Sequence, residues 1–274
     1  MEYTIRQVAT DENALKQILT LLNCTFPKAS KFTLPYLKWQ YADNPLGEIV
    51  GFNAFFDDTL AAHYVAMPIE MNLFGRKRKG LLSLNTATHP DHRGKKLFSI
   101  LADKTYSYAA DNGFEYVIGV ANANSTHGFL KNLGFYLISP LIVKVGTGRN
   151  IYDSAGKACC RIWNEDVLKW RLNNPSATYY SSKNIIYGKR GCPGIKLIMG
   201  HIENNIRTSN PPVTRPANLY IGLGADFNHG HYYPLPKFVK HSPFNLIFKD
   251  LTGGSIPVIK PEDILFQLID FDVA

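Results

Sequence analysis

A short segment that joins a β-rich run directly to an amphipathic helix constrains the fold of this chain most. The run 81–88 ends just before residues 95–112, where Leu97, Leu101 and Tyr106 recur at helical spacing. A strand-to-helix junction gathers free backbone N–H groups and the positive end of the helix dipole at one point. Arg93, Lys95 and Lys96 add cations where a helix start disfavours them. The junction therefore predicts a bound anion, and Gly94 lets it approach the main chain.

The elements around this junction predict an α/β (α+β) domain. We expect a strand at 3–8, helices beginning near 12 and at 34–41, and β-rich runs at 49–56, 60–73 and 81–88. The basic run 76–79 is predicted as a turn. After the helix at 95–112 we expect a strand at 115–120, a helix at 125–133 and one strand at 135–145. This order predicts a mixed, largely antiparallel sheet flanked by helices.

One segment in the second part of the chain is similar in sequence to a segment in the first part. Residues 37–45 are matched, after one deletion, by residues 168–175, and both segments place a Trp before an Asn-Pro pair. A Trp anchor followed by an Asn-Pro turn also recurs by chance. We favour a duplicated fold, with domains at 1–148 and 149–274.

Charge and composition limit the partners. The net charge of +8 favours polyphosphate ligands as much as nucleic acid, and no basic stripe interleaved with aromatic residues is present, so we expect no nucleic-acid partner. No run reaches the length of about 20 apolar residues that spans a bilayer, which predicts a cytoplasmic protein without a membrane partner. The four cysteines lack metal-ligand spacing, so no metal is expected. The oligomeric state stays open.

The junction and its surroundings resemble the GCN5-related N-acetyltransferase (GNAT) superfamily. The resemblance rests on Pro90 and Arg93-Gly94, on residues 120–125 of the next strand, and on 133–135 closing the following helix. It implies a GNAT fold over residues 1–146 and an acyl-CoA cofactor, either acetyl-CoA or a longer acyl-CoA. The implied cofactor contacts are Ala87, Thr88, His89, Arg93, Gly94, Lys95, Lys96, Leu97, Phe98, Asn124, Ser125 and Phe129.

The chain departs from the family pattern at three places. Lys96 and Phe98 stand where the family has glycine or alanine. The family's tyrosine, which protonates the departing thiolate, is also missing, because Phe129 and Leu130 occupy that neighbourhood. Water or the attacking amine is then expected to supply the proton. For Asn124 and Ser125, an ordinary helix cap is the alternative to cofactor contact.

Acyl transfer to an amine needs a positioned nucleophile and a polarised carbonyl. Strand alternation predicts that Ser83 and Asn85 share one face of the run 81–88, and no carboxylate lies on it. We expect Asn85, with Ser83, to position the amine; a buried polar pair is the structural alternative. His63, His89, His92 and His127 are alternative bases, each interpreted as a surface or turn residue.

The acceptor follows from a narrower resemblance. The segments 39–41 and 44–47, with the junction, are similar to two-domain GNAT enzymes that acylate nucleotide-linked amino-deoxysugars in bacterial surface-polysaccharide pathways. Trp39 and Asn44 are then candidate acceptor contacts, as are His229, His231 and Tyr232 in the second part. A GNAT enzyme acting on another small molecule, a peptide or RNA, and a non-catalytic CoA-binding module, are the alternatives.

Overall fold

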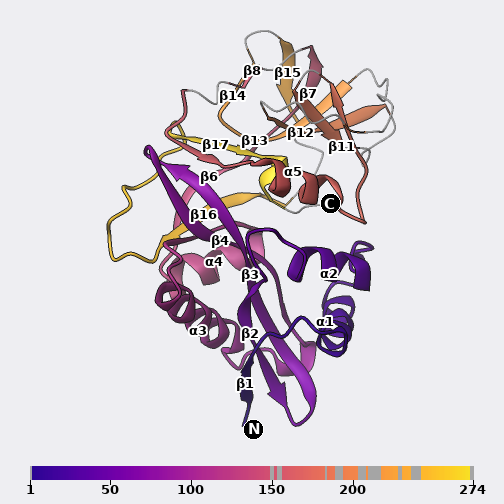
Figure 1. Cartoon of the computed structure of the whole chain (residues 1–274), viewed down its shortest axis with the longest axis vertical. Helices are drawn as coiled ribbons and strands as arrows, with labels where there is room; N and C mark the ends of the chain where they lie inside the picture. The colour runs from indigo at the N-terminus through magenta and orange to yellow at the C-terminus, as the bar shows by residue number, and fades with distance from the viewer. Residues whose placement is uncertain are drawn as a thin grey trace.

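The computed structural model describes residues 2–148, 151–152, 156–182, 184–188, 194–202, 208, 217–227, 230–235 and 242–271. Figure 1 shows a helix-flanked part built from the first half of the chain and a strand-rich part built largely from the second. The two parts share one 15-stranded sheet. The site therefore sits on a framework to which both halves of the sequence contribute.

The first half follows the predicted order of elements. It contains β1 (Thr4–Gln7), α1 (Glu12–Thr25), α2 (Leu34–Tyr41), β2 (Val50–Phe56), β3 (Thr59–Leu73), β4 (Arg76–Thr88), the 3-10 helix η1 (Pro90–His92), α3 (Leu97–Asp111), β5 (Tyr116–Ala121), α4 (Ala123–Asn132) and β6 (Tyr136–Pro140). Local signals explain the helix starts, because Asp11, Thr33 and Asn122 each accept backbone N–H groups as N-caps. The mixed, helix-flanked sheet predicted from the sequence is confirmed.

The second half is mostly strands. It contains β7 (Ile142–Gly148), β8 (Ile151–Tyr152), β9 (Cys159–Arg161), α5 (Glu165–Leu172), β10 (Tyr179–Ser182), β11 (Ile185–Gly188), β12 (Ile195–His201), β13 (Ala217–Leu223), β14 (Ala225–Asp226), β15 (Gly230–Pro234), β16 (Asn245–Asp250), β17 (Ile264–Gln267) and the 3-10 helix η2 (Leu268–Asp270). β9 and β17 connect its sheet to β3 of the first half.

The sheet of the first half divides its core into two layers. α1 and α2 cover one face, and α3 and α4 cover the other (Figure 1). One apolar cluster joins Leu15 and Ile18 of α1 to Leu82 of β4, and a second joins Leu97 and Leu101 of α3 to the opposite face. We call these the α1 face and the α3 face. A functional group on β4 can reach only one of them unless the strand is distorted.

The two parallel strands in the middle of this sheet separate. β4 and β5 pair from Gly80 and Tyr116 to Ser83 and Gly119, and no pairing continues beyond that point although both strands do. A V-shaped gap therefore opens between residues 84–88 of β4 and the end of β5. Such a gap leaves backbone groups and side chains of both strands accessible to a ligand.

The predicted single strand at 135–145 is wrong in one respect, because it is two strands that belong to different halves. β6 pairs with β16 in the first half, whereas β7 lies between β13 and β15 in the second. The chain changes direction at Leu141, whose backbone N–H donates to the carbonyl of Phe244 at 2.7 Å. In return β16 lies between β5 and β6. Each half thus receives one strand from the other.

The repeated Trp segments meet face to face. The rings of Trp39 on α2 and Trp170 on α5 stack with centroids 4.7 Å apart. Each indole N–H donates to the backbone carbonyl of the other residue, both at 2.8 Å. The strand arrangement repeats as well, since β12 and β13 are parallel like β4 and β5. The domain division at 148 stays a prediction, because β7 and β16 cross between the parts.

The predicted turn at 76–79 is instead the first part of β4, and the turn is formed by Phe74 and Gly75, both with positive φ. The basic side chains are accommodated by strand neighbours. Lys77 pairs with Glu70 at 2.8 Å, Arg78 pairs with Glu115, and Lys79 lies over the Phe114 ring. Cross-strand pairing therefore outweighs the local preference of a charge run for a loop.

Among the described residues, no helix combines the length and the apolar character needed to span a bilayer. Cys24, Cys159 and Cys160 are free thiols, and Cys192 lies outside the described residues. The described part of the chain also holds no cluster of three metal-ligating side chains.

Candidate active site

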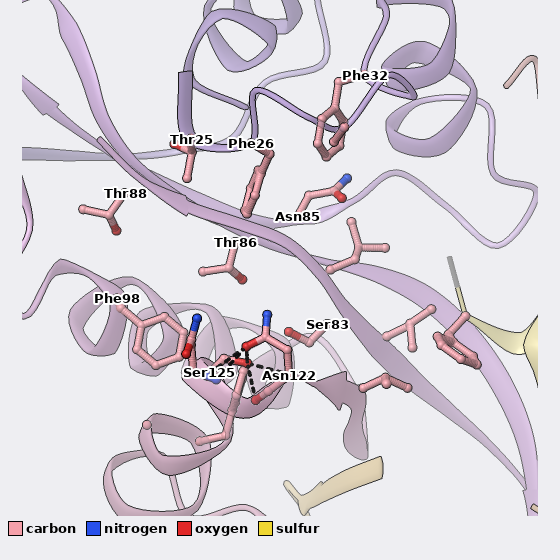
Figure 2. A pocket seen from close by; sticks show the side chains of 18 of the residues that line it. Thr25, Phe26, Phe32, Ser83, Asn85, Thr86, Thr88, Phe98, Asn122 and Ser125 are labelled. Carbon is pink, nitrogen blue, oxygen red and sulfur yellow. Dashed lines mark hydrogen bonds between the residues drawn. The ribbon is translucent and has the colours of Figure 1, made fainter. Parts of the chain in front are cut away.

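A cavity of about 700 Å³ passes through the gap between β4 and β5 (Figure 2). Its walls come from both faces of the sheet. The lining residues are Thr25, Phe26, Ala29, Lys31, Phe32, Leu82, Ser83, Leu84, Asn85, Thr86, Thr88, Arg93, Phe98, Val120, Asn122, Asn124, Ser125, Gly128, Phe129 and Phe271. The gap therefore connects a polar opening on the α3 face with an aromatic chamber on the α1 face.

The turn before α3 has the features of an anion site. Gly94 has a φ of +74° and Lys96 a φ of +58°, and within the described chain no side chain caps the helix start. The first N–H groups of α3 are consequently left for a ligand. Arg93 lines the cavity and is exposed to solvent. This combination of helix start and guanidinium fits a diphosphate group.

Lys96 explains one departure from the family pattern. Its left-handed φ is a conformation that glycine adopts without strain, so the turn keeps the glycine geometry with a lysine in place. Phe98 explains another. Its ring stacks edge-on against Phe129 with centroids 5.2 Å apart, and a Cβ added to Gly128 would lie 3.2 Å from it. The extra bulk of Phe98 is thus accommodated by a glycine on α4.

The start of α4 forms the opposite wall of the polar opening. Asn122 accepts the backbone N–H groups of Asn124 and Ser125 at 2.9 and 3.0 Å, and the Ser125 hydroxyl contacts the Asn122 backbone N–H in return. Ser125 completes a capping box and also lines the cavity, so its contact with the cofactor stays a prediction. Asn124 is exposed beside it.

Asn85 lies at a β-bulge that overturns the predicted strand alternation. His63 of β3 is paired with Ala87 and Val65 with Leu84, so two residues of β4 lie opposite one residue of β3. Asn85 adopts a φ of +48° at this point. Figure 2 shows Asn85 on the side of Phe26 and Phe32, and Ser83 on the side of Asn122. The prediction that they share a face is wrong, because the bulge rotates the strand between them.

A buried polar chain orients Asn85. Its side-chain NH2 donates to Gln40 Oε1 at 2.6 Å and to the Tyr41 hydroxyl at 3.2 Å. Tyr41 contacts Nε2 of His63 at 3.0 Å, and His63 Nδ1 contacts Asn53 Oδ1 at 2.7 Å. Since an amide oxygen only accepts, His63 carries its proton on Nδ1 and accepts from Tyr41. Asn85 is left with its carbonyl oxygen as the group that a ligand can use.

His63 is not the surface or turn residue that we expected, because it is fully buried between β2 and α2. Burial lowers the pKa of His63 to about 3, so the imidazole is neutral near pH 7. Burial also raises the pKa of Tyr41 well above its ordinary value. Neither group is suited to take a proton from an amine at neutral pH, so the chain fixes geometry instead.

Ser83 belongs to a second hydroxyl chain on the α3 face. Its Oγ lies 3.0 Å from the Tyr64 hydroxyl, which contacts the Tyr106 hydroxyl of α3 in turn. Burial raises the pKa of Tyr64 to about 12 and that of Tyr106 well above its usual range. Both tyrosines are therefore neutral at pH 7. Ser83 is held at the apex of the gap, where β4 and β5 last pair.

The structure brings together eight of the predicted cofactor and catalytic residues at the cavity. They are Ser83, Asn85, Thr88, Arg93, Phe98, Asn124, Ser125 and Phe129. Gly94, Lys95, Lys96 and Leu97 follow Arg93 in the turn and helix start. Ala87 is buried beside His63, and the His89 backbone N–H already donates to the Ala61 carbonyl at 2.9 Å.

The predicted acceptor residues that the structure describes do not line this cavity. Trp39 is buried against Trp170, and the Asn44 side chain donates to the Pro68 carbonyl at 2.9 Å within a turn. His231 and Tyr232 lie on β15 in the second half, where the Tyr232 hydroxyl accepts from Asn218. His229 lies outside the described residues. Trp39 and Asn44 thus have structural roles in the described chain.

Several lining residues were missed. Phe26 and Phe32 come from the loop between α1 and α2, and Phe271 follows η2 near the end of the described chain. The pair of aromatic residues around Pro27 was a local signal for the first two. Phe271 carried none, because only the long-range fold brings it to β4.

Comparisons with known proteins agree with this fold. A family model described as an acetyltransferase (GNAT) domain matches residues 4–138. A probable N-acyltransferase from Enterococcus faecalis is similar in structure with a TM-score of 0.63 and 11% identity, over 92% of this chain and 73% of that chain. A GCN5-related N-acetyltransferase from Anabaena variabilis has a TM-score of 0.62 and 10% identity, over 91% and 74%. At these identities the likeness establishes the fold.

A more distant structure is N-myristoyltransferase from Saccharomyces cerevisiae with bound myristoyl-CoA. Its TM-score is 0.52 at 8% identity, covering 72% of this chain and 63% of that chain. No curated protein matches the sequence.

Proposed function

We propose that this protein, whose residues 4–138 match a GNAT acetyltransferase domain model, transfers an acyl group from acyl-CoA to the amine of a nucleotide-linked amino-deoxysugar. The proposed pathway is surface-polysaccharide biosynthesis. One observation carries the acyltransferase proposal: the gap between β4 and β5 opens into a cavity that reaches both faces of the sheet. Two reactants can meet there from opposite sides.

The residues on the α3 face fit acyl-CoA. The uncapped start of α3 and Arg93 would hold its diphosphate, and Phe98, Asn124 and Ser125 would border the rest. When bound, acyl-CoA supplies an acyl group activated as a thioester, whose carbon–sulfur bond is exchanged for a carbon–nitrogen bond while the amine's proton leaves with the sulfur as a free thiol. Asn85 and Ser83 lie on opposite faces of the sheet.

Asn85 is proposed to orient the acceptor. Its NH2 group is held by Gln40 and Tyr41, so its carbonyl oxygen accepts a hydrogen from the amine and aims the nitrogen lone pair at the gap. No Asp, Glu or His is among the described lining residues. The amine is therefore expected to enter in its neutral form or to lose its proton to water.

The nucleotide-sugar acceptor is supported by the sequence resemblance and by two further observations. Phe26 offers an exposed aromatic surface at the α1-side mouth of the cavity, on which a base or a sugar ring can stack. The net charge of +8 favours the capture of a diphosphate-linked substrate.

Thiol release tests the proposal. The protein is incubated with acetyl-CoA and longer acyl-CoAs, and nucleotide-linked 3-amino and 4-amino sugars are added one at a time. We expect thiol release that depends on one amino sugar and that weakens about tenfold in Arg93→Ala at limiting acyl-CoA. Thiol release that depends instead on a peptide, RNA or an unrelated amine would contradict the proposed nucleotide-sugar acceptor. CoA binding without any release would favour a non-catalytic module.

A further inference from the structure

The part of the cavity on the α1 face is a chamber with largely apolar walls. It is lined by Ala29, Phe32, Leu82, Leu84, Val120 and Phe271. All six belong to the apolar cluster of the α1 face or pack against it, whereas Phe98 and Phe129 belong to the cluster of the other face. Leu82, Phe271 and Phe32 are only 2%, 4% and 8% exposed. The chamber is thus an apolar extension of the gap between β4 and β5.

Thr25, Lys31 and Asn85 are polar residues on this side, and the hydroxyl oxygen of Thr25 is buried. Thr25 and Lys31 are half-buried beside Phe26, which is 36% exposed. Asn85 stands at the gap itself, with its NH2 group already donated. A sugar or phosphate placed in the chamber would bury polar atoms among aromatic and aliphatic walls, which is unfavourable without hydrogen-bond partners. A hydrocarbon chain has no hydrogen bonds to lose there and gains from leaving water.

We propose that this chamber binds a straight-chain acyl group longer than acetyl, so that the enzyme prefers medium-chain or longer acyl-CoA. The inference rests on the proposed acyl-CoA-dependent function and adds the class of acyl donor. The thioester carbon stands at the gap, the alkyl chain extends from it into the chamber, and the amine approaches past Asn85 from the mouth. The bond exchange is the one already described and needs no further reactant.

Phe271 makes the chamber a product of both halves of the chain. It follows η2, whose position is set by Arg171 donating to the carbonyls of Ile269 and Phe271, both at 3.1 Å. Arg161 holds the same segment through the carbonyl of Asp270 at 2.6 Å. The wall that Phe271 contributes is therefore held in place by the second half, and we expect the volume of the chamber to set an upper length limit for the acyl chain.

The test measures the full-length protein with saturated acyl-CoAs of increasing length. Dissociation constants come from calorimetry without acceptor, and kcat/KM comes from thiol release with the accepted amine. Affinity should rise about threefold to fourfold per methylene until the chamber is full and then fall. An equal affinity for acetyl-CoA and hexanoyl-CoA would overturn the proposal, even if thiol release showed the proposed function to be right.

A substitution that fills part of the chamber distinguishes binding of the acyl chain in the chamber from non-specific hydrophobic binding. Ala29→Leu should lower the ratio of hexanoyl-CoA to acetyl-CoA affinity by about tenfold or more, because it occupies chamber volume. Ala110→Leu, the same change at an exposed position of α3, is the matched control and should leave the ratio unchanged. An unchanged ratio in Ala29→Leu, or a methylene dependence found only in a series of amines, would overturn the proposal.

If no acyl-CoA is turned over, the proposed function fails, and the binding series still decides the chamber. Affinity that increases with chain length and is sensitive to Ala29→Leu would support acyl binding without transfer. Thermal shifts of both variants without ligand identify any loss of folding, because Ala29 is only partly buried.

Discussion

The two halves use the same sheet geometry for opposite purposes. In the first half, β4 and β5 pair as far as Ser83 and Gly119, and the gap beyond them opens into the cavity. In the second half, β12 and β13 pair from Ile195 and Ala217 to Ile198 and Tyr220, and they also stop pairing before either strand ends. Both pairs of parallel strands therefore form a V.

The second V is filled by the chain itself. The side chain of Gln267 accepts from the His201 backbone N–H at 2.6 Å and donates to the His201 carbonyl at 3.2 Å. A Cβ added to Gly200 would lie 2.9 Å from Ile269. The connection from β12 to β13, residues 202–216, is also shorter than the connection from β4 to β5, residues 89–115, which contains α3. Two parallel strands that separate thus leave a gap between them. Whether other segments of the chain occupy the gap decides whether a ligand can bind there.

The largest expected effect comes from separating the halves. A fragment of residues 1–148 loses β16, whose Leu246, Ile247 and Phe248 are fully buried in the first sheet. Each side chain contributes about 1.5–3 kcal/mol by burial, which together approaches the stability of a whole domain of about 5–15 kcal/mol. We expect no cooperative thermal unfolding of the fragment by circular dichroism.

Co-expression of residues 149–274, which carry β16, is the control for that fragment. It should restore a cooperative transition if the missing strand is the cause. A sharp transition for 1–148 alone would mean that the first half does not depend on the exchanged strand.

The first prediction about the open gap between β4 and β5 concerns the side-chain amide of Asn85. Asn85→Gly keeps the left-handed backbone at φ +48° but deletes the side chain that Gln40 and Tyr41 hold. We expect kcat to fall by about 10²-fold, as for other lost polar contacts to a reacting group, with little change in the melting temperature. Full activity would remove the positioning role, and Asn85→Ala would show the added cost of strain.

The occupied gap between β12 and β13 is tested by adding one methyl group at Gly200. In Gly200→Ala the new Cβ would meet Ile269 at 2.9 Å and Gln267 at 3.0 Å, so overpacking should cost about 1–3 kcal/mol in the free energy of unfolding. Gly119→Ala at the apex of the open V is the matched change, with one neighbour at 3.3 Å, and should cost less. Denaturant unfolding of both decides. An equal cost would contradict the difference in filling.

Each half also buries one titratable group, and the two groups change the stability of the fold in opposite directions as the pH rises. The pKa of His63 is lowered to about 3 by burial, so its contribution to stability is present above pH 6.5 and is lost as the pH falls toward 3. At pH 5 the loss is about 2 kcal/mol. Burial raises the pKa of Asp270 to about 6, so its contribution is present below pH 3.8 and is lost as the pH rises through 6.

Melting temperatures of His63→Gln and Asp270→Asn between pH 4 and 8 separate these contributions. His63→Gln should remove the acid-side loss, and Asp270→Asn should remove the loss on the neutral side. If His63→Gln leaves the pH profile of the parent unchanged, His63 is not held in its neutral form by the fold.

Local sequence signals were sufficient where each element depends on its own residues. The order of elements in the first half, the bounds of α2 and the junction at Arg93 followed from periodicity, caps and turn residues. The repeated Trp segments also correctly marked two corresponding helices. These features are encoded within a few residues of each other.

Features that depend on distant segments were not predictable in this way. The insertion of β16 between β5 and β6 pairs residues more than a hundred positions apart, and no periodicity specifies that partner. The bulge at Asn85 left one usable sign, since asparagine is enriched in left-handed conformations. Phe271 reaches the cavity only because Arg161 and Arg171 bind the segment that precedes it.

The exchanged strands also set the order of events during synthesis. A ribosome completes β5 at Ala121 long before it makes β16 at 245–250, so the slot between β5 and β6 stays empty while most of the second half is being translated. Domains commonly fold from the N-terminus as they emerge. The nascent first sheet of this protein instead stays unfinished, with an unsatisfied strand edge, until β16 has been translated.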